Sequence, residues 1–105
     1  MSQYSTVRLD RRYRMHRAGF ELMLIWSWPA SSNRFSIDHP WQEQRRYEQA
    51  AQRTLGAAYY QYANPRGTWS SQYRRRTSKN SIQETVEERL FLRSERHLTL
   101  LQLAV

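Results

Sequence analysis

Residues Phe20 to Trp28, FELMLIWSW, form the most hydrophobic stretch of this sequence and decide the fold that it predicts. Large apolar side chains occupy every position except Glu21 and Ser27, which is typical of a β-strand buried on both faces. A membrane-spanning helix needs about 20 apolar residues, and this stretch is much shorter. We therefore expect a buried strand and no membrane span.

The residues before this stretch alternate between apolar and polar side chains from Val7 to Met15. A period of two predicts a strand with one buried face, although Arg11 breaks the alternation and leaves open a bulge or an edge position. Arg17-Ala18-Gly19 offers a short turn before Phe20, because glycine tolerates a positive φ. The N-terminal part is therefore predicted to be a β-hairpin.

Downstream, the pattern changes to helical spacing. Asp38-His39-Pro40 is typical of a helix start, and apolar residues then recur every three or four positions. We therefore expect a long helix to Ala63, which Asn64-Pro65 ends because the residue before a proline disfavours the helical conformation. Residues 65–80 are predicted to be a basic loop. A short helix over residues 81–92 is preferred to a strand, which the same residues also fit, and a terminal strand is expected over His97–Val105.

These elements define an α+β fold class. We expect a small antiparallel sheet, made of the N-terminal hairpin plus a C-terminal strand, with one long and one short helix packed on one face. At 105 residues the chain is predicted to be a single small basic domain over residues 1–105. Trp26, Trp28 and Trp41 are expected to close its core, with a ligand pocket there as the alternative, and Tyr60 is expected to point outward.

Positive charge is concentrated in two segments. The formal net charge is +8, and all but Lys79 of the 17 basic residues are arginine. Residues 1–36 carry a net charge of +4 and residues 65–80 carry +5, whereas the remaining segments are neutral or slightly negative. Such clustering is what a phosphate-binding surface requires, because several phosphates neutralised together release condensed counterions.

The candidate nucleic-acid-binding residues come from both segments. The first arginines are expected to project as one row from a strand, and the second set combines cations with aromatic rings that could stack on bases. Both sets could also be ordinary solvated residues. The candidates are Arg8, Arg12, Arg14, Arg17, Trp69, Tyr73, Arg74, Arg75, Arg76 and Lys79.

Catalytic and metal-binding patterns are missing from the sequence. There is no cysteine, and the three histidines lack metal-ligand spacing, so neither a disulfide nor a metal site is expected. No phosphate-binding glycine motif or hydrolase elbow occurs, and no cofactor is expected. We expect a non-enzymatic protein; the alternative is a metal-independent ribonuclease that pairs His16 with His97.

The sequence therefore predicts a module that binds nucleic acid or a ribonucleoprotein through arginine–phosphate contacts. The alternative is a protein-interaction module, either an inhibitor encoded by a virus or mobile element or a structural subunit, that docks on an acidic protein surface. The N-terminal residues lack the pattern of a secretory signal, so an intracellular location is expected. RNA and DNA are not distinguished at this level.

Overall fold

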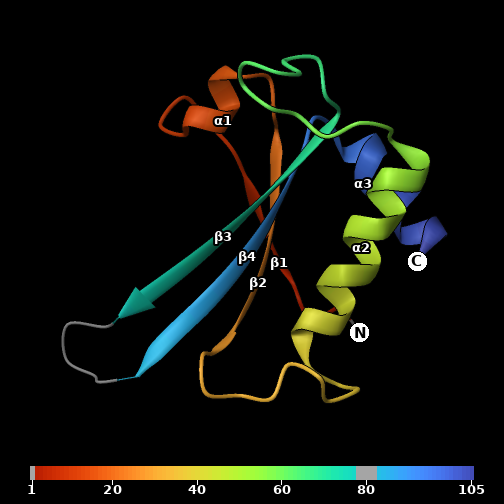
Figure 1. Ribbon diagram of the computed structural model, residues 1–105. Helices are drawn as coiled ribbons and strands as arrows, with labels where there is room; N and C mark the ends of the chain where they lie inside the picture. Colours follow the sequence, from red (N-terminus) through yellow and green to blue (C-terminus); the bar gives the residue numbers. More distant parts are fainter. Residues whose placement is uncertain (1, 78–82) are drawn as a thin grey trace.

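The computed structural model describes residues 2–77 and 83–105, and its strands form one antiparallel sheet in the order β1-β2-β4-β3 (Figure 1). Along the chain the elements are β1 (Ser5–Arg8), α1 (Arg14–Arg17), β2 (Leu22–Pro29), α2 (Pro40–Thr54), β3 (Trp69–Thr77), β4 (Glu84–Leu92) and α3 (Glu95–Ala104). The fold class is α+β, as the sequence predicts. The β1–β2 hairpin is confirmed, and β2 lies inside the sheet between β1 and β4.

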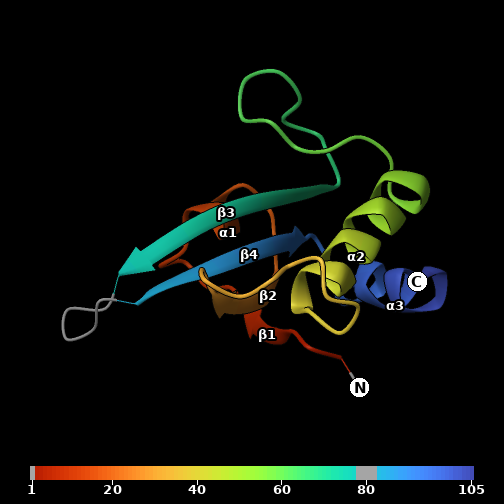
Figure 2. The same ribbon diagram turned by 60° about the horizontal axis from the view of Figure 1, so that its bottom comes forward.

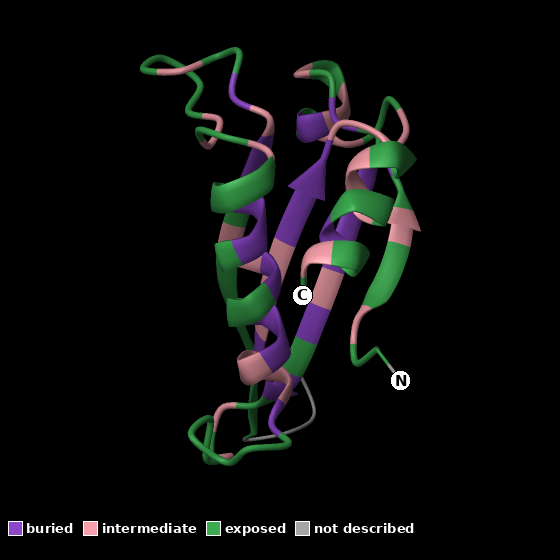
Figure 3. Cartoon of the chain, turned by 90° about the vertical axis from the view of Figure 1, so that its right-hand side faces the viewer, coloured by how far each residue is buried: buried purple, intermediate pink, exposed green. Residues whose placement is uncertain are grey.

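Helices α2 and α3 cover one face of the sheet, which we call the helix face (Figure 2). The even-numbered residues of β2 and β4 point to this side, because Leu24 lies opposite Leu90 and both are fully buried. Their partners on the helices include Tyr47 and Ala51 of α2 and Leu101 of α3. Figure 3 shows buried residues along the inner side of α2 and along the neighbouring strands, where this main core lies.

The opposite side of the sheet, which we call the open face, carries the odd-numbered residues of β2 and β4. At one end it is covered by α1, whose Met15 packs with Phe20, Met23 and Phe91 in a second, smaller cluster. Within the described residues no other helix covers this face. The even-numbered residues of β3 lie there too, since Arg74 is opposite Glu87.

Two predicted elements are shorter than expected. The first strand ends at Arg8 rather than Met15, because Asp10 accepts backbone hydrogen bonds from Arg12 and Tyr13 in a turn that leads into α1. The long helix ends at Thr54, nine residues before Ala63, because Gly56 adopts a φ of +89°. A left-handed glycine just beyond the last turn is a common helix stop.

Three predictions in the second half of the chain are wrong. The predicted basic loop contains β3, and the part of the predicted short helix that the structure describes is β4, the alternative that the same residues fit. The predicted terminal strand is α3, which begins where the Ser94 hydroxyl accepts from the His97 backbone amide at 3.4 Å. Residues 78–82, which include Lys79 and the proposed helix cap Ser81, lie outside the described residues.

Candidate nucleic-acid interface

The N-terminal arginines do not form the single row that the sequence predicts. Arg8 lies on the helix face and pairs with Glu95 of α3, whereas Arg12 sits in the turn and pairs with Asp10 at 2.8 Å. This pairing lowers the pKa of the Asp10 carboxyl. Arg14 and Arg17 belong to α1, on the other side of the sheet. The predicted row is split because the strand that would have carried it ends at Arg8.

Arg14 and Arg17 line a cavity of about 580 Å³ between α1 and the beginning of β3, which we call the α1 cavity. Its other lining residues are mostly polar and include Tyr60, Ser70 and Gln72. The Arg14 guanidinium donates to the side-chain oxygen of Gln61, a neutral partner, so its charge is not neutralised there. The cavity therefore brings two arginines of the first basic segment next to the strand that carries the second.

The arginines of β3 alternate between the two faces. Arg74 and Arg76 lie on the open face, and Arg75 lies on the helix face, opposite Val86. Gln72, at the rim of the α1 cavity, shares the open face with Arg74 and Arg76, and neighbours on one face are about 6.6 to 7 Å apart along a strand. A line of polar and basic side chains thus continues along β3 from the cavity.

A carboxylate on the open face partly neutralises this line. Glu87 of β4 pairs with Arg89 at 2.9 Å, and Arg76 lies 3.8 Å from its other oxygen. Arg74 is exposed and forms no ion pair with a carboxylate of the described residues. The least neutralised cations on this side are therefore Arg14, Arg17 and Arg74, with Arg76 weakly paired.

The two predicted aromatic anchors differ. Trp69 is only 4 % exposed and its indole N–H donates to the Gly56 carbonyl at 2.9 Å, so it belongs to the core and cannot stack on a base. Tyr73 is 55 % exposed, but it lies on the helix face, opposite Glu88. The described strand of the second segment thus presents Arg74 and Arg76 to the open face, and Tyr73 with Arg75 to the helix face.

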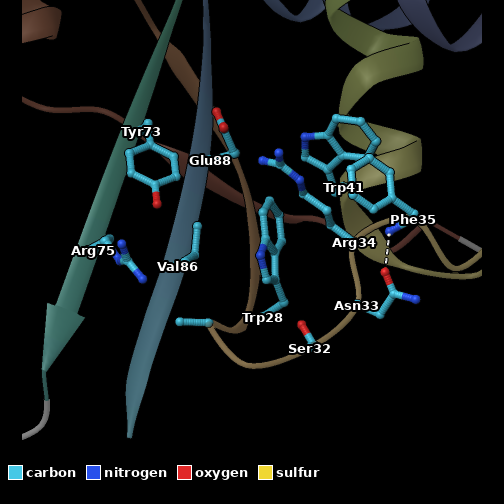
Figure 4. A pocket seen from close by; sticks show the side chains of 11 residues that line it. Trp28, Ser32, Asn33, Arg34, Phe35, Trp41, Tyr73, Arg75, Val86 and Glu88 are labelled. Atoms are coloured by element: carbon cyan, nitrogen blue, oxygen red, sulfur yellow. Dashed lines mark hydrogen bonds between the residues drawn. The ribbon is translucent and has the colours of Figure 1, made fainter.

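Tyr73 forms part of a cleft on the helix face, which we call the β3 cleft (Figure 4). Val86 and Glu88 of β4 form its floor, and Tyr73 and Arg75 form the wall at the sheet edge. The facing wall combines residues of β2, of the 30–39 segment and of the start of α2: Trp28, Ala30, Ser32, Asn33, Arg34, Phe35 and Trp41. The end of β3 and the start of β4 lie away from α2, and the 30–39 segment runs between them and the start of that helix (Figure 1).

Hydrogen bonds hold the segment that forms this wall. The backbone amide of Trp41 donates to Nδ1 of His39 at 3.1 Å, and Nε2 of His39 lies 2.8 Å from the Ser32 hydroxyl. That hydroxyl in turn donates to the Pro29 carbonyl at 2.6 Å. Since Nδ1 accepts, Nε2 carries the proton of the neutral ring and donates to Ser32. One histidine therefore caps α2 and fastens the wall to the end of β2.

Glu88, on the cleft floor, has an unusual environment. Burial raises the pKa of its carboxyl to about 7, with a further contribution from the charge of Glu48 on α2. Within the described residues Glu88 forms no hydrogen bond or ion pair. No local pattern in the sequence marks Glu88 for binding, because its position beneath a cleft follows from strand pairing.

Other predicted features can now be placed. Tyr60 is exposed, as expected, and Trp26 lies in the core, whereas Trp28 and Trp41 also line the β3 cleft.

His16 on α1 and His97 on α3 belong to helices on opposite faces of the sheet, so the proposed ribonuclease pair is not assembled. Burial lowers the pKa of His97, and nearby Arg93 and Arg96 add to this shift.

The described residues contain no group of three or more potential metal ligands. None of their helices has the length and apolar character that a membrane crossing requires. In comparisons with known proteins, no family model, curated protein or solved structure matches this chain.

Proposed function

We propose that this protein binds nucleic acid through the open face of its sheet. The observation that carries the proposal is the α1 cavity, because it adjoins β3 and so joins Arg14 and Arg17 to the basic line of Arg74 and Arg76. Arginine offers a planar fork of donors that matches phosphate oxygens. Backbone phosphates are the contacts expected here, since the basic line contains no accessible aromatic ring beyond Tyr60 at the cavity.

A salt titration tests this proposal. Binding of a short labelled single strand is measured by fluorescence anisotropy between about 50 and about 200 mM salt. Each phosphate contact on a single strand contributes about −0.7 to the slope of log K against log salt, so four arginines predict a slope of about −3. Absence of binding at low salt, or an affinity that salt leaves unchanged, would overturn the proposal.

β3 itself supplies matched variants. Arg74→Gln with Arg76→Gln removes two open-face cations and is expected to reduce the magnitude of the slope by about 1.4. Arg75→Gln removes one cation from the same strand, but on the helix face, and is expected to change the slope much less. Equal effects of the single and double changes would mean that the open face is not the contact surface.

The alternative from the sequence, docking on an acidic protein surface, has a separate outcome. The protein is purified from cells with and without nuclease treatment. A nucleic-acid binder loses its co-purifying nucleic acid after the treatment, whereas a docking protein keeps its polypeptide partner. Retention of a stoichiometric acidic protein after nuclease treatment, with no oligonucleotide binding, would favour docking.

A further inference from the structure

The β3 cleft has the composition of a small-molecule site. Its volume is about 360 Å³, which lies in the range of ligand pockets, and its walls combine several aromatic rings with a few polar groups. Trp28 and Tyr73 come from different strands and stand on either side of Val86 (Figure 4). A flat ring is the ligand shape that such walls accommodate, because aromatic faces stack on aromatic faces.

The charges at the cleft favour an anionic group on that ligand. The Arg34 guanidinium lies 5.2 Å from the Phe35 ring centre and 5.3 Å from that of Trp41, and no carboxylate of the described residues pairs with it. Arg75, on the opposite wall, shares its charge with Glu84 at 3.0 Å. Together they leave a positive charge at the cleft that a phosphate can neutralise.

The floor adds a hydrogen-bonding group. Glu88 has no partner among the described residues, and in its neutral form a carboxyl group offers one donor and one acceptor side by side. An adjacent donor and acceptor on the edge of a nucleobase complement that pair: an amino group beside a ring nitrogen in adenine and cytosine, and a ring N–H beside a carbonyl in guanine and uracil. The raised pKa, about 7, keeps much of the neutral form present near neutrality.

We propose that the β3 cleft binds a nucleotide whose base stacks on the exposed ring of Tyr73 over Glu88, with the edge of the buried Trp28 at the far wall, while its phosphate contacts Arg34 and Arg75. The nucleotide is either free or part of a single strand that passes over the edge of the sheet at β3. Only the strand-borne form rests on the proposed function, because β3 carries Arg74 and Arg76 on its other face.

The four tryptophans provide an internal control for the test. Trp28 and Trp41 line the cleft, whereas the indoles of Trp26 and Trp69 donate to Glu43 and Gly56 in the core. On addition of adenosine monophosphate, the indole N–H resonances of Trp28 and Trp41 are expected to shift in NMR spectra and the other two to stay. Trp28→Phe and Trp41→Phe identify the signals. No shift at millimolar nucleotide, or equal shifts of all four signals, would overturn the proposal.

Variants test each contact. Tyr73→Ala is expected to weaken adenosine monophosphate about tenfold, as loss of one stacking ring does, and the exposed Tyr62→Ala is its control. Arg34→Gln is expected to weaken the nucleotide but not the nucleoside, with Arg46→Gln as control. Glu88→Leu is expected to weaken adenosine monophosphate about fivefold through loss of the hydrogen bonds to the base, whereas Glu88→Gln keeps a donor and an acceptor and should bind like the parent.

Three further probes separate the remaining outcomes. Ribose 5-phosphate carries the phosphate without a base, so if it binds as tightly as adenosine monophosphate, the cleft is an anion site without base recognition and the proposal is overturned. Resonance shifts of Trp28 and Trp41 that free arginine causes and the nucleotide does not would overturn it too. An adenine single strand that shifts Trp28 and Trp41, and that Tyr73→Ala weakens, identifies the strand-borne form. Arg74→Gln with Arg76→Gln leaves binding of the mononucleotide intact, so failure of the open face and failure of the cleft are distinguishable.

Discussion

The indole N–H of Trp26 donates a hydrogen bond to Oε1 of Glu43 at 3.0 Å, in the core between β2 and α2. The same oxygen accepts from the backbone amide of Gln3 at 2.8 Å. One buried carboxylate therefore ties the N-terminal segment, the central strand and the long helix together. Its place in the first turn of α2 is also electrostatically favourable, because the helix dipole is positive at that end.

Loss of this acceptor is expected to destabilise the fold. Glu43→Ala leaves a buried indole donor unsatisfied, and the free energy of unfolding should fall by about 2 to 3 kcal/mol. Glu43→Gln keeps an acceptor oxygen and should cost less. Denaturant unfolding of the three proteins measures the difference, and an equal loss in both variants would contradict the role of the hydrogen bond.

The raised pKa of Glu88 predicts a pH dependence of stability. The folded chain holds this proton more tightly than the unfolded chain, so the contribution of Glu88 is most favourable below about 4.5 and is lost as pH rises through about 7. Glu88→Gln removes the titration. Relative to the parent, this variant should therefore gain stability as pH rises from about 5 to about 8, on the order of 1 kcal/mol because the group is only partly buried. Parallel stability–pH curves would contradict it.

Arg93 is expected to act as a structural arginine. Its guanidinium donates to the carbonyls of Gly67, Ala18 and Pro65 at 2.9, 2.9 and 3.2 Å, and it lies 4.4 Å from the centre of the Phe20 ring. Arg93→Ala should lower the free energy of unfolding by about 3 kcal/mol, because three carbonyls and a cation–π contact lose their partner. The exposed Arg66→Ala is the control and should be nearly neutral. Similar losses in both would contradict the assignment.

Two glycines are predicted to resist substitution for different reasons. A Cβ at Gly67 would lie 2.3 Å from the backbone nitrogen of Tyr59, whereas Gly56 has open space but a φ of +89°. Gly56→Ala should cost about 1 kcal/mol of backbone strain, and Gly67→Ala should cost more because backbone must move. Thermal unfolding of both variants tests the order, and a smaller loss for Gly67→Ala would contradict the close approach.

The α+β class and the hairpin were predictable because Phe20–Trp28 carries a strong local pattern. The ends of elements depended on contacts that the pattern does not show. Arg74, Arg75 and Arg76 have the composition of a loop, yet they form a strand because β4 pairs with them over its whole length. Likewise, the residues of β4 have helical spacing at Val86 and Leu90, and they form a strand because they pair with β2 on one side and β3 on the other.

The candidate site was predictable only in part. Charge clustering identified the arginines of β3, but their division between two faces follows from a strand where their composition predicts a loop. Arg34 and Glu88 come together in one cleft although more than half the sequence separates them. Such a site follows from strand order, which residue spacing does not encode.

The position of β3 at the edge of the sheet has a consequence for how copies of the protein meet. Beyond Trp69, the outer side of β3 has no strand neighbour among the described residues, and an unpaired edge is a template on which a second molecule can add. Arg74, Arg75 and Arg76 set like charges along this edge, and charged side chains on an edge strand disfavour such an addition, although Glu84 and Glu87 neutralise part of that charge.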